Sequence, residues 1–235
     1  MKQRGITLLE VLIAVTLLSL LSVAMFLAMR IGLNSYERAG TRLMDNRRVA
    51  GAQRIVQSEL EGLVPVIATC LSPTGGPGPK TLFFEGQPQV MRLVSTFSLN
   101  QGARGQPQIL EIFVIPGENG RGVRLVANET LYTGPLGAGR FCTGPRQFLP
   151  VDIGPKTFVL ADKLAYCHFA YLVPPPAPLQ PAVWNDTWTK EMWPMAIRID
   201  MAPLDPNPAA VEPISVVAPL NLHRSPGIQY EDLQY

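Results

Sequence analysis

Few side chains in this sequence combine the residue types and the spacing that catalysis needs. Cys167 and His168 are adjacent, and a cysteine beside a histidine could form a nucleophile and its base. They lie, however, in a segment typical of a β-strand, where neighbouring side chains point to opposite faces. The other histidine, His223, has no evident partner in the sequence. We therefore predict a structural or surface role for His168 and no Cys–His dyad.

The acidic and glycine-rich segments predict neither a metal site nor a nucleotide site. Asp152 and Asp162 are isolated along the chain, and no Asp- and Asn-rich loop of the calcium-binding kind occurs. The segment GENGRG (117–122) resembles a phosphate-binding loop, but it joins two predicted strands and opens no helix. This position is typical of a hairpin turn. We expect no enzymatic activity, no cofactor and no bound metal.

Glu10 is the residue whose position most needs a chemical explanation. It lies near the start of an apolar segment, residues 6–29, that is otherwise interrupted only by hydroxyl side chains. A carboxylate costs roughly 2.5–3.5 kcal/mol at the centre of a membrane helix. The part of the segment after Glu10 would form a helix of about 28 Å, close to the ~30 Å hydrocarbon thickness. We predict a membrane span, and Lys2 and Arg4 before it place the N-terminus in the cytoplasm.

Composition separates this helical start from the rest of the chain. The net charge of the 235-residue chain is only +2, which gives no reason to expect nucleic-acid binding. None of the 23 prolines precedes Pro65. Because proline costs about 3 kcal/mol in a helix interior, residues 30–64 can continue the helix.

Residues 30–64 have the pattern of an amphipathic helix. Apolar residues recur there every three or four positions, which predicts one face packed on a folded domain. They are Val49, Ala52, Val56, Leu60 and Leu63. Charged residues, Glu59 and Glu61 among them, are predicted on the remaining, solvent-facing surface. Gly62 and Pro65 supply the end of the helix.

Beyond Pro65 the apolar residues recur every second position, which predicts β-strands. In MAIRIDMA (195–202) Met195, Ile197, Ile199 and Met201 share one face, opposite Arg198 and Asp200. Other strands are predicted at 92–99, 109–115, 122–132, 164–172 and 213–220. The sequence thus predicts an α+β fold, in which a long N-terminal helix packs on an antiparallel sheet.

The cysteines and tryptophans leave alternatives open. Cys70, Cys142 and Cys167 follow no metal-ligand spacing. Outside the cytoplasm they could form one disulfide in any of three pairings, or all three could be small buried residues. Trp184, Trp188 and Trp193 lie within WNDTWTKEMWP (184–194). They form either a partner-binding face or, as is more common for such aromatics, a lid over the sheet.

The start of the chain resembles a known processing signal. A basic leader, then Gly5, then ITLLEVLIA with a glutamate fifth after the glycine is similar to the class III signal of type IV pilins and type II secretion pseudopilins. The resemblance implies that a prepilin peptidase cuts between Gly5 and Ile6 and methylates Ile6, although the family usually has Phe there. It also implies that Glu10 pairs with the N-terminal amine of a neighbouring subunit during assembly.

A second resemblance covers part of the predicted sheet. LAYCHFAYL (164–172) followed by a loop and WPMAIRIDM (193–201) is similar to the minor pseudopilin J family of type II secretion. This implies a subunit near the tip of a short periplasmic filament, anchored in the bacterial inner membrane. Its partners would be minor pseudopilins of the I, K and H types and the major pseudopilin.

These resemblances imply a division of the chain into four parts. Residues 1–5 would be the leader, 6–29 the membrane-spanning half of the helix, 30–64 its amphipathic half and 65–235 the periplasmic domain. The nearest alternative is a minor pilin of a type IV pilus or a DNA-uptake machine. An enzyme or sensor on a plain anchor would keep an uncut N-terminus, and a secreted soluble protein would lose the whole apolar segment.

Overall fold

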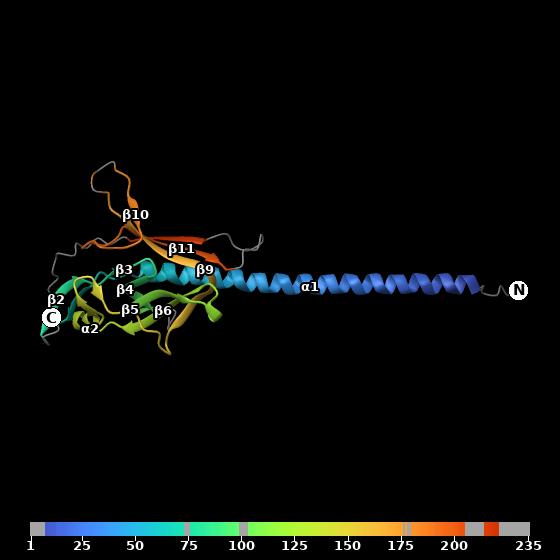
Figure 1. The fold of residues 1–235 in the computed structure, drawn as a ribbon, viewed down its shortest axis with the longest axis horizontal. Helices are drawn as coiled ribbons and strands as arrows, with labels where there is room; N and C mark the ends of the chain where they lie inside the picture. Colours follow the sequence, from blue (N-terminus) through green and yellow to red (C-terminus); the bar gives the residue numbers. More distant parts are fainter. Residues whose placement is uncertain are drawn as a thin grey trace. The chain divides into compact units, whose positions relative to one another are not determined.

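The computed structural model describes residues 8–72, 76–98, 103–175, 177, 180–204 and 214–220. Its architecture is the predicted α+β fold: a long N-terminal helix and a β-rich domain (Figure 1). The chain divides into two compact units, Met1–Arg47 and Arg48–Tyr235. The boundary falls inside helix α1 (Leu8–Glu61), so the last turns of this helix belong to the β-rich unit.

Helix α1 ends where the sequence predicts, at Glu61, just before Gly62. Gly62 also allows the chain to approach the sheet closely. A Cβ atom at this position would lie 2.8 Å from the hydroxyl oxygen of Ser95 and 3.2 Å from the backbone nitrogen of Phe97. A side chain here would therefore crowd the neighbouring strand, which adds a second constraint to helix termination.

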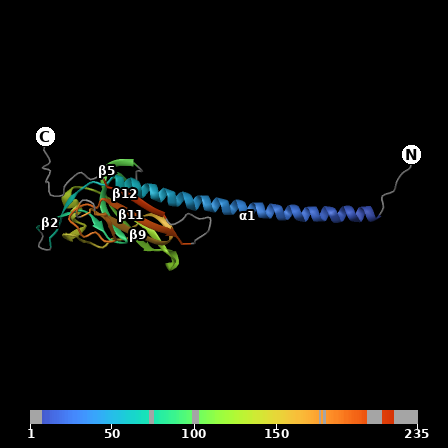
Figure 2. The same cartoon turned by 90° about the horizontal axis from the view of Figure 1, so that it is seen from above.

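In the described part of the chain, eight antiparallel strands form the main sheet, in the order β12-β11-β9-β6-β5-β4-β3, with β10 paired to β9. Figure 2 shows β12, β11 and β9 side by side. The strands are β3 (Glu85–Gly86), β4 (Val90–Ser98), β5 (Ala103–Pro116), β6 (Val123–Leu131), β9 (Phe158–Val173), β10 (Val183–Asn185), β11 (Ala196–Pro203) and β12 (Ile214–Pro219).

The predicted hairpin is confirmed. Strands β5 and β6 pair from Gln108↔Leu131 to Pro116↔Val123, and the 3-10 turn η1 (Glu118–Gly120) joins them. Asn119 has a φ of 56° and Gly120 a φ of 70°, the left-handed conformation that Asn-Gly pairs favour in hairpins.

Three strands differ from the prediction. Strand β5 begins at Ala103, not at Ile109. Strand β9 begins at Phe158, not Leu164, because its first half pairs with β6 and its second half with β11. Lys163, with a φ of 55°, lies between the two halves. The expected inward position of Met195 is wrong: it precedes β11 and its side chain is 47% exposed, whereas Ile197 and Ile199 are buried as expected.

Strand β12 is an outer strand of the sheet, with β11 as its one neighbour among the described residues. The backbone N–H of Leu220 donates to the carbonyl of Met195 at 2.8 Å. Because antiparallel pairs alternate, Ala218 and Val216 then also direct their N–H groups at β11. Ser215 and Val217 direct theirs outward, and Pro219, at the next outward position, has no N–H group.

The main core lies where the sheet surrounds the end of α1. Val56 and Leu60 are buried against residues of every long strand of the sheet. The strand residues include Leu93, Ile112, Leu125, Phe169, Ile199 and Val216. Figure 1 shows β9 and β11 on one side of this part of the helix and β4, β5 and β6 on the other. The predicted contact stripe is thus confirmed for Val56, Leu60 and Leu63; the side chains of Val49 and Ala52 lie outside the described residues.

The opposite face of β4 and β5 is covered by a second, smaller core. It is built from short elements whose buried residues include Ala68, Phe83, Val94, Ile109 and Ala138. The elements are β1 (Ile67–Leu71), β2 (Pro77–Leu82), α2 (Pro135–Gly139), β7 (Cys142–Gly144) and β8 (Gln147–Phe148). Since both faces of β4 and β5 are covered, these strands are buried on both sides.

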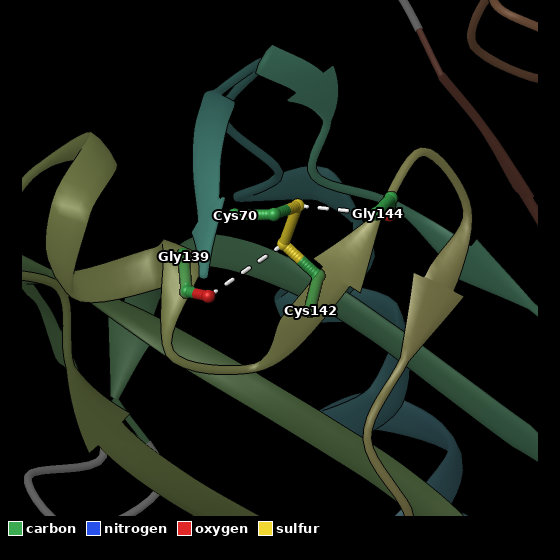
Figure 3. The surroundings of a disulfide bond; sticks show 4 residues. All are labelled: Cys70, Gly139, Cys142 and Gly144. Carbon is green, nitrogen blue, oxygen red and sulfur yellow. Dashed lines mark hydrogen bonds between the residues drawn. A yellow bond between two sulfur atoms is a disulfide. The ribbon is translucent and has the colours of Figure 1, made fainter. Parts of the chain in front are cut away.

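One disulfide ties this second layer together. Cys70 in β1 is bonded to Cys142 in β7, across a sequence separation of 72 residues (Figure 3). Their sulfur atoms lie 3.6 Å and 3.7 Å from the backbone carbonyl oxygens of Gly144 and Gly139 (Figure 3). Cys167 is the buried free cysteine. A Cβ atom at Gly139 would lie 1.7 Å from the carbonyl oxygen of Thr69, so only glycine lets α2 sit against β1 here.

Candidate functional site

The apolar N-terminal segment is the first candidate for function. Residues Leu8–Tyr36 of α1 form one helix that is long and apolar enough to cross a membrane, and none of its most apolar stretch is buried within the protein. At 1.5 Å per residue, its 29 residues extend about 43 Å, more than the ~30 Å of a hydrocarbon core. Large side chains such as Leu8 and Met25 are 84% and 71% exposed. Such a surface requires an apolar environment from outside the chain.

Three hydroxyl groups in this segment are hydrogen-bonded within the helix. Thr16 donates to the carbonyl of Ile13 at 2.9 Å, and Ser19 donates to the carbonyl of Thr16 at 2.8 Å. Ser22 donates to the carbonyl of Leu18 at 2.9 Å. Each hydroxyl therefore enters hydrocarbon already hydrogen-bonded, which makes these polar residues compatible with a membrane span.

Glu10 lies in the first turn of α1 and is exposed. An acidic side chain is favoured at this end of a helix, because the unpaired backbone N–H groups there carry partial positive charge. The two residues of the expected cleavage site, Gly5 and Ile6, lie outside the described residues. The structure thus places the carboxylate at the start of the exposed apolar helix, beside the position where processing is expected.

The three tryptophans do not form one exposed face. Trp188 and Trp193 are only 6% and 7% exposed. The indole N–H of Trp188 donates to the carbonyl of Met192 at 2.7 Å, and Trp193 packs edge-on against Phe84 at 5.4 Å. Both rings therefore close the main core, as lid residues do. Both rings point inward because the loop between β10 and β11 folds back onto β3. There the backbone of Trp188 forms an antiparallel β-bridge with Gly86.

Trp184 lies apart from the other two tryptophans. It is half-buried in β10, and the guanidinium of Arg198 lies 4.7 Å from the centre of its ring. Arg198 also pairs with Asp200 at 2.8 Å on the same outer face of β11. Of the expected partner face, only Trp184 thus contributes to the protein surface, in a cation–π contact.

Cys167 and His168 point to opposite sides of β9. Cys167 is buried in the main core, where burial raises the pKa of its thiol to about 12, with a smaller contribution from the charge of Asp200. His168 is exposed and stacks on Tyr166, with ring centres 5.7 Å apart. A thiol with so high a pKa is a poor nucleophile. The predicted absence of a dyad holds for this pair, and His223 lies outside the described residues.

Asp162 forms an ion pair with Arg124. The guanidinium of Arg124 lies 2.8 Å from it and also contacts Glu118, and this hydrogen bonding lowers the pKa of Asp162. Among the residues that the structure describes, no group of three or more His, Cys, Asp and Glu side chains could hold a metal ion.

Three buried charged residues, Arg92, Glu111 and Glu59, were not recognised as buried from the sequence, and Arg92 lies at the centre of one cluster. Its side chain is fully buried between the disulfide layer and β4, where it donates to Glu111 at 2.7 Å and to Glu85 at 2.6 Å. Phe141 and Phe148 flank its guanidinium at 5.7 Å and 5.3 Å. Burial raises the pKa of Glu85, an effect that the charge of Arg92 opposes. An arginine within the apolar run of β4 was the signal for this cluster.

Glu59 was predicted on the solvent-facing surface of the helix. This prediction is wrong, because Glu59 is buried. Its side chain is 1% exposed, on the buried side of α1. The spacing contained the signal, because Glu59 lies three residues after Val56 and four before Leu63, which are both buried. Glu59 was nevertheless predicted at the surface because its side chain is charged. Glu61, by contrast, is exposed as expected.

Comparison with known proteins agrees with the geometry of the N-terminal segment. Residues 1–26 match the prokaryotic N-terminal methylation motif, which marks type IV pilin-like proteins. The match covers the expected cleavage site, Glu10 and most of the exposed apolar helix. Comparison with curated proteins gives no match to this chain. The proteins that this motif marks are structural and not enzymatic. Together with the motif, the apolar N-terminal helix of this chain indicates a membrane-anchored protein.

Proposed function

We propose that this chain is a minor pseudopilin of a type II protein secretion system, a structural subunit at or near the tip of the periplasmic pseudopilus. The observation that carries the proposal is the N-terminal methylation motif on an exposed apolar helix that continues into a β-rich domain. The resemblance of 164–172 and 193–201 to the J family favours the type II system. These two segments lie in β9 and β11, which pair with each other along their length.

Processing at the N-terminus would prepare the chain for assembly. A prepilin peptidase would cut between Gly5 and Ile6 and methylate the new terminus at Ile6. The cut removes the basic leader, including Lys2 and Arg4, which otherwise holds the start of the helix at the cytoplasmic surface. Glu10 then becomes the fifth residue of the mature chain, one helical turn from the new amine.

Glu10 would set the position of the helix in the filament. Its carboxylate is exposed in the free chain and would be costly in hydrocarbon without a cation. The N-terminal amine of a neighbouring subunit supplies that cation in this proposal. Breaking a buried pair by removing one partner typically costs about 3–5 kcal/mol, so the pair fixes which axial displacement between neighbouring helices is favoured.

The Cys70–Cys142 disulfide supports a location of the β-rich unit outside the cytoplasm, because cytosolic disulfides are rare. We place the helix in the bacterial inner membrane, with the N-terminus cytoplasmic and the β-rich unit periplasmic. Its partners there would be minor pseudopilins of the I, K and H types and the major pseudopilin. The helix would pack among their helices, and the β-rich unit would contact the other minor subunits.

The N-terminal peptide tests this proposal directly. Full-length chain would be expressed with and without the prepilin peptidase, extracted from membranes and analysed by mass spectrometry. We expect a chain beginning at Ile6, with added methyl groups, only when the peptidase is present, and an uncut chain for the Gly5→Val variant. A wild-type chain that begins at Met1 in the presence of the peptidase would overturn the proposal.

Co-purification separates the two filament systems. After chemical cross-linking in membranes, a type II subunit should be recovered with pseudopilins of the I and K types. Recovery with the pilins of a type IV pilus, and without those pseudopilins, would favour the alternative of a minor pilin and overturn the assignment to secretion.

A further inference from the structure

In the described part of the chain, the carboxyl group of Glu59 is enclosed in the main core and has no ion-pair partner. The side chain is 1% exposed, and both of its carboxyl oxygens are buried with no hydrogen-bond partner. Among the residues that the structure describes, no ion pair includes it. A buried carboxylate without a cation or a donor is strongly disfavoured, and such a group takes up a proton instead.

Among the described residues, the groups that act on the charge of Glu59 include no cation. The pKa of Glu59 is raised from 4.5 to about 8, and burial is the main cause. The nearby hydroxyl of Ser95 on β4 lowers this pKa in part, and the negative charge of Glu129 on β6 raises it. On β9, Cys167 and Tyr171 face the same core, and burial raises the pKa of both groups, which keeps them neutral. The interior of the unit therefore favours the uncharged form of Glu59.

Glu59 lies where the end of α1 is joined to strand β4. We call residues 59–64, together with 94–96 of β4, the junction. The hydroxyl of Ser95 donates to the backbone carbonyl of Glu59 at 2.9 Å, and the backbone N–H of Thr96 donates to the carbonyl of Gly62 at 2.8 Å. The backbone N–H of Val64 donates to the carbonyl of Val94 at 2.8 Å. A charge at Glu59 would therefore have to be accommodated inside a closely bonded contact.

We propose that the junction is a pH-sensitive contact: it is closed while Glu59 carries a proton, and loss of that proton weakens the packing of the end of α1 on β4. The proposal concerns the β-rich unit alone and is independent of the proposed role in secretion. Its consequence is that the stability of this unit follows the pH of the compartment in which it lies, through one carboxyl group on the helix that carries the unit.

The direction of the pH dependence follows from the two protonation states. The pKa of Glu59 is about 8 in the folded unit and about 4.5 in an exposed chain. Below pH 4.5 both states hold the proton, and the contribution to stability is fully present. Between these values the folded state binds more protons than the unfolded state, so stability falls as pH rises. A one-proton difference changes the folding equilibrium constant by up to about tenfold per pH unit.

The test compares the wild type with Glu59→Gln, which keeps the shape but cannot ionise. Full-length chains in detergent micelles would be unfolded with urea between pH 5 and 9, with tryptophan fluorescence as the signal, since Trp188 and Trp193 are buried. Glu59→Met is the second variant, in case a buried amide prevents folding. Glu61→Gln is the matched control, because Glu61 is exposed near the end of the same helix.

The quantity to follow is the folding equilibrium constant of the wild type divided by that of Glu59→Gln or Glu59→Met. We expect this ratio to fall by up to about tenfold for each pH unit between pH 5 and pH 8. It should then level off, and Glu61→Gln should follow the wild type. Glu129→Gln should move the end of the fall to lower pH, because it removes a nearby negative charge. A ratio that stays constant from pH 5 to 9 for both Glu59 variants would overturn the proposal.

Hydrogen exchange locates the effect. The protection of the backbone N–H groups of Val64 and Thr96, corrected for the intrinsic effect of pH on exchange, should fall between pH 6 and 8.5 in the wild type and not in Glu59→Gln. Equal pH dependence in both chains at these two amides would show that the junction is not the element that responds, which would also overturn the proposal.

Discussion

The two ends of helix α1 each place a carboxyl group in apolar surroundings, and they do so in opposite ways. At the N-terminal end, Glu10 is exposed and so are the apolar residues that follow it. At the other end, Glu59 is enclosed by the sheet of its own chain. The first carboxyl group lies on a part of the helix that the rest of the chain leaves exposed, whereas the second lies in the interior of the β-rich unit, where the uncharged form is favoured. The proposed function gives the first an assembly role, and the fold of the β-rich unit encloses the second.

A third carboxyl site provides the reference for both. Glu85 and Glu111 share the buried Arg92, so here the neutralising charge comes from within the same chain. Only at this third site do the described residues show the neutralising cation directly. Substitutions at these sites, at the disulfide and at the tryptophans test the contrast, and the largest effect is expected at Glu10.

Glu10→Ala should abolish assembly while leaving membrane insertion intact. Loss of one partner of a buried pair typically costs about 3–5 kcal/mol, which is more than a hundredfold in association. The measurement is recovery of the chain with the major pseudopilin after cross-linking in membranes. Glu61→Ala is the control, and its recovery should match that of the wild type. Normal recovery of Glu10→Ala would show that this carboxylate does not set assembly.

Arg92→Met should destabilise the β-rich unit by about 3–5 kcal/mol, because it leaves Glu85 and Glu111 buried without their cation. Urea unfolding at pH 7 measures the change. Adding Glu85→Gln and Glu111→Gln to this variant should restore part of the lost free energy, since no uncompensated charge then remains. If the triple variant is less stable than Arg92→Met, the hydrogen bonds matter more than the charges.

Removal of the disulfide should have a somewhat smaller effect. Cys70→Ser combined with Cys142→Ser should lower the free energy of unfolding by about 2–4 kcal/mol, mostly by freeing the unfolded chain. A reducing agent should shift the thermal midpoint of the wild type and not that of the double variant. Cys167→Ala should keep the sensitivity of the wild type to reduction, because Cys167 is not in the disulfide.

Trp184→Ala should have the smallest effect, about 0.5–1 kcal/mol, from loss of its cation–π contact with Arg198. Trp188→Ala is the contrast, at about 3–5 kcal/mol, because it opens a cavity in the main core. Thermal unfolding compares the two. Similar losses for both variants would mean that Trp184 also belongs to the core.

The sequence predicted the parts of the fold that depend on local pattern. The apolar span, the end of α1 near Gly62 and the hairpin at Asn119-Gly120 follow from residue spacing and turn chemistry. The pairing of Cys70 with Cys142 could not be predicted, because it depends on the layer that covers the far face of β4 and β5. The length of β9 was missed for a similar reason, since its two halves pair with different strands.

The candidate site was predictable only in part. Glu10 was identified because a charge in a long apolar run is unusual in any environment. Glu59 and Arg92 were not, since in amphipathic segments a charge is normally at the surface, and only the enclosing sheet shows that these two are inside. For the tryptophans the sequence left a partner-binding face and a lid as alternatives, and the fold of the loop shows that Trp188 and Trp193 are lid residues.

The outer strand β12 limits how chains of this kind can associate with one another. An open sheet edge with a full row of outward amides can be extended by a strand from a second molecule, which leads to uncontrolled polymerisation. Within the described strand β12, Ser215 and Val217 present outward N–H groups, and Pro219 interrupts the row. A strand from a second copy would therefore find few hydrogen-bond donors along β12, and Pro219 disfavours fusion of two sheets at this edge. This protection would matter most if, as proposed, many copies are crowded along a filament.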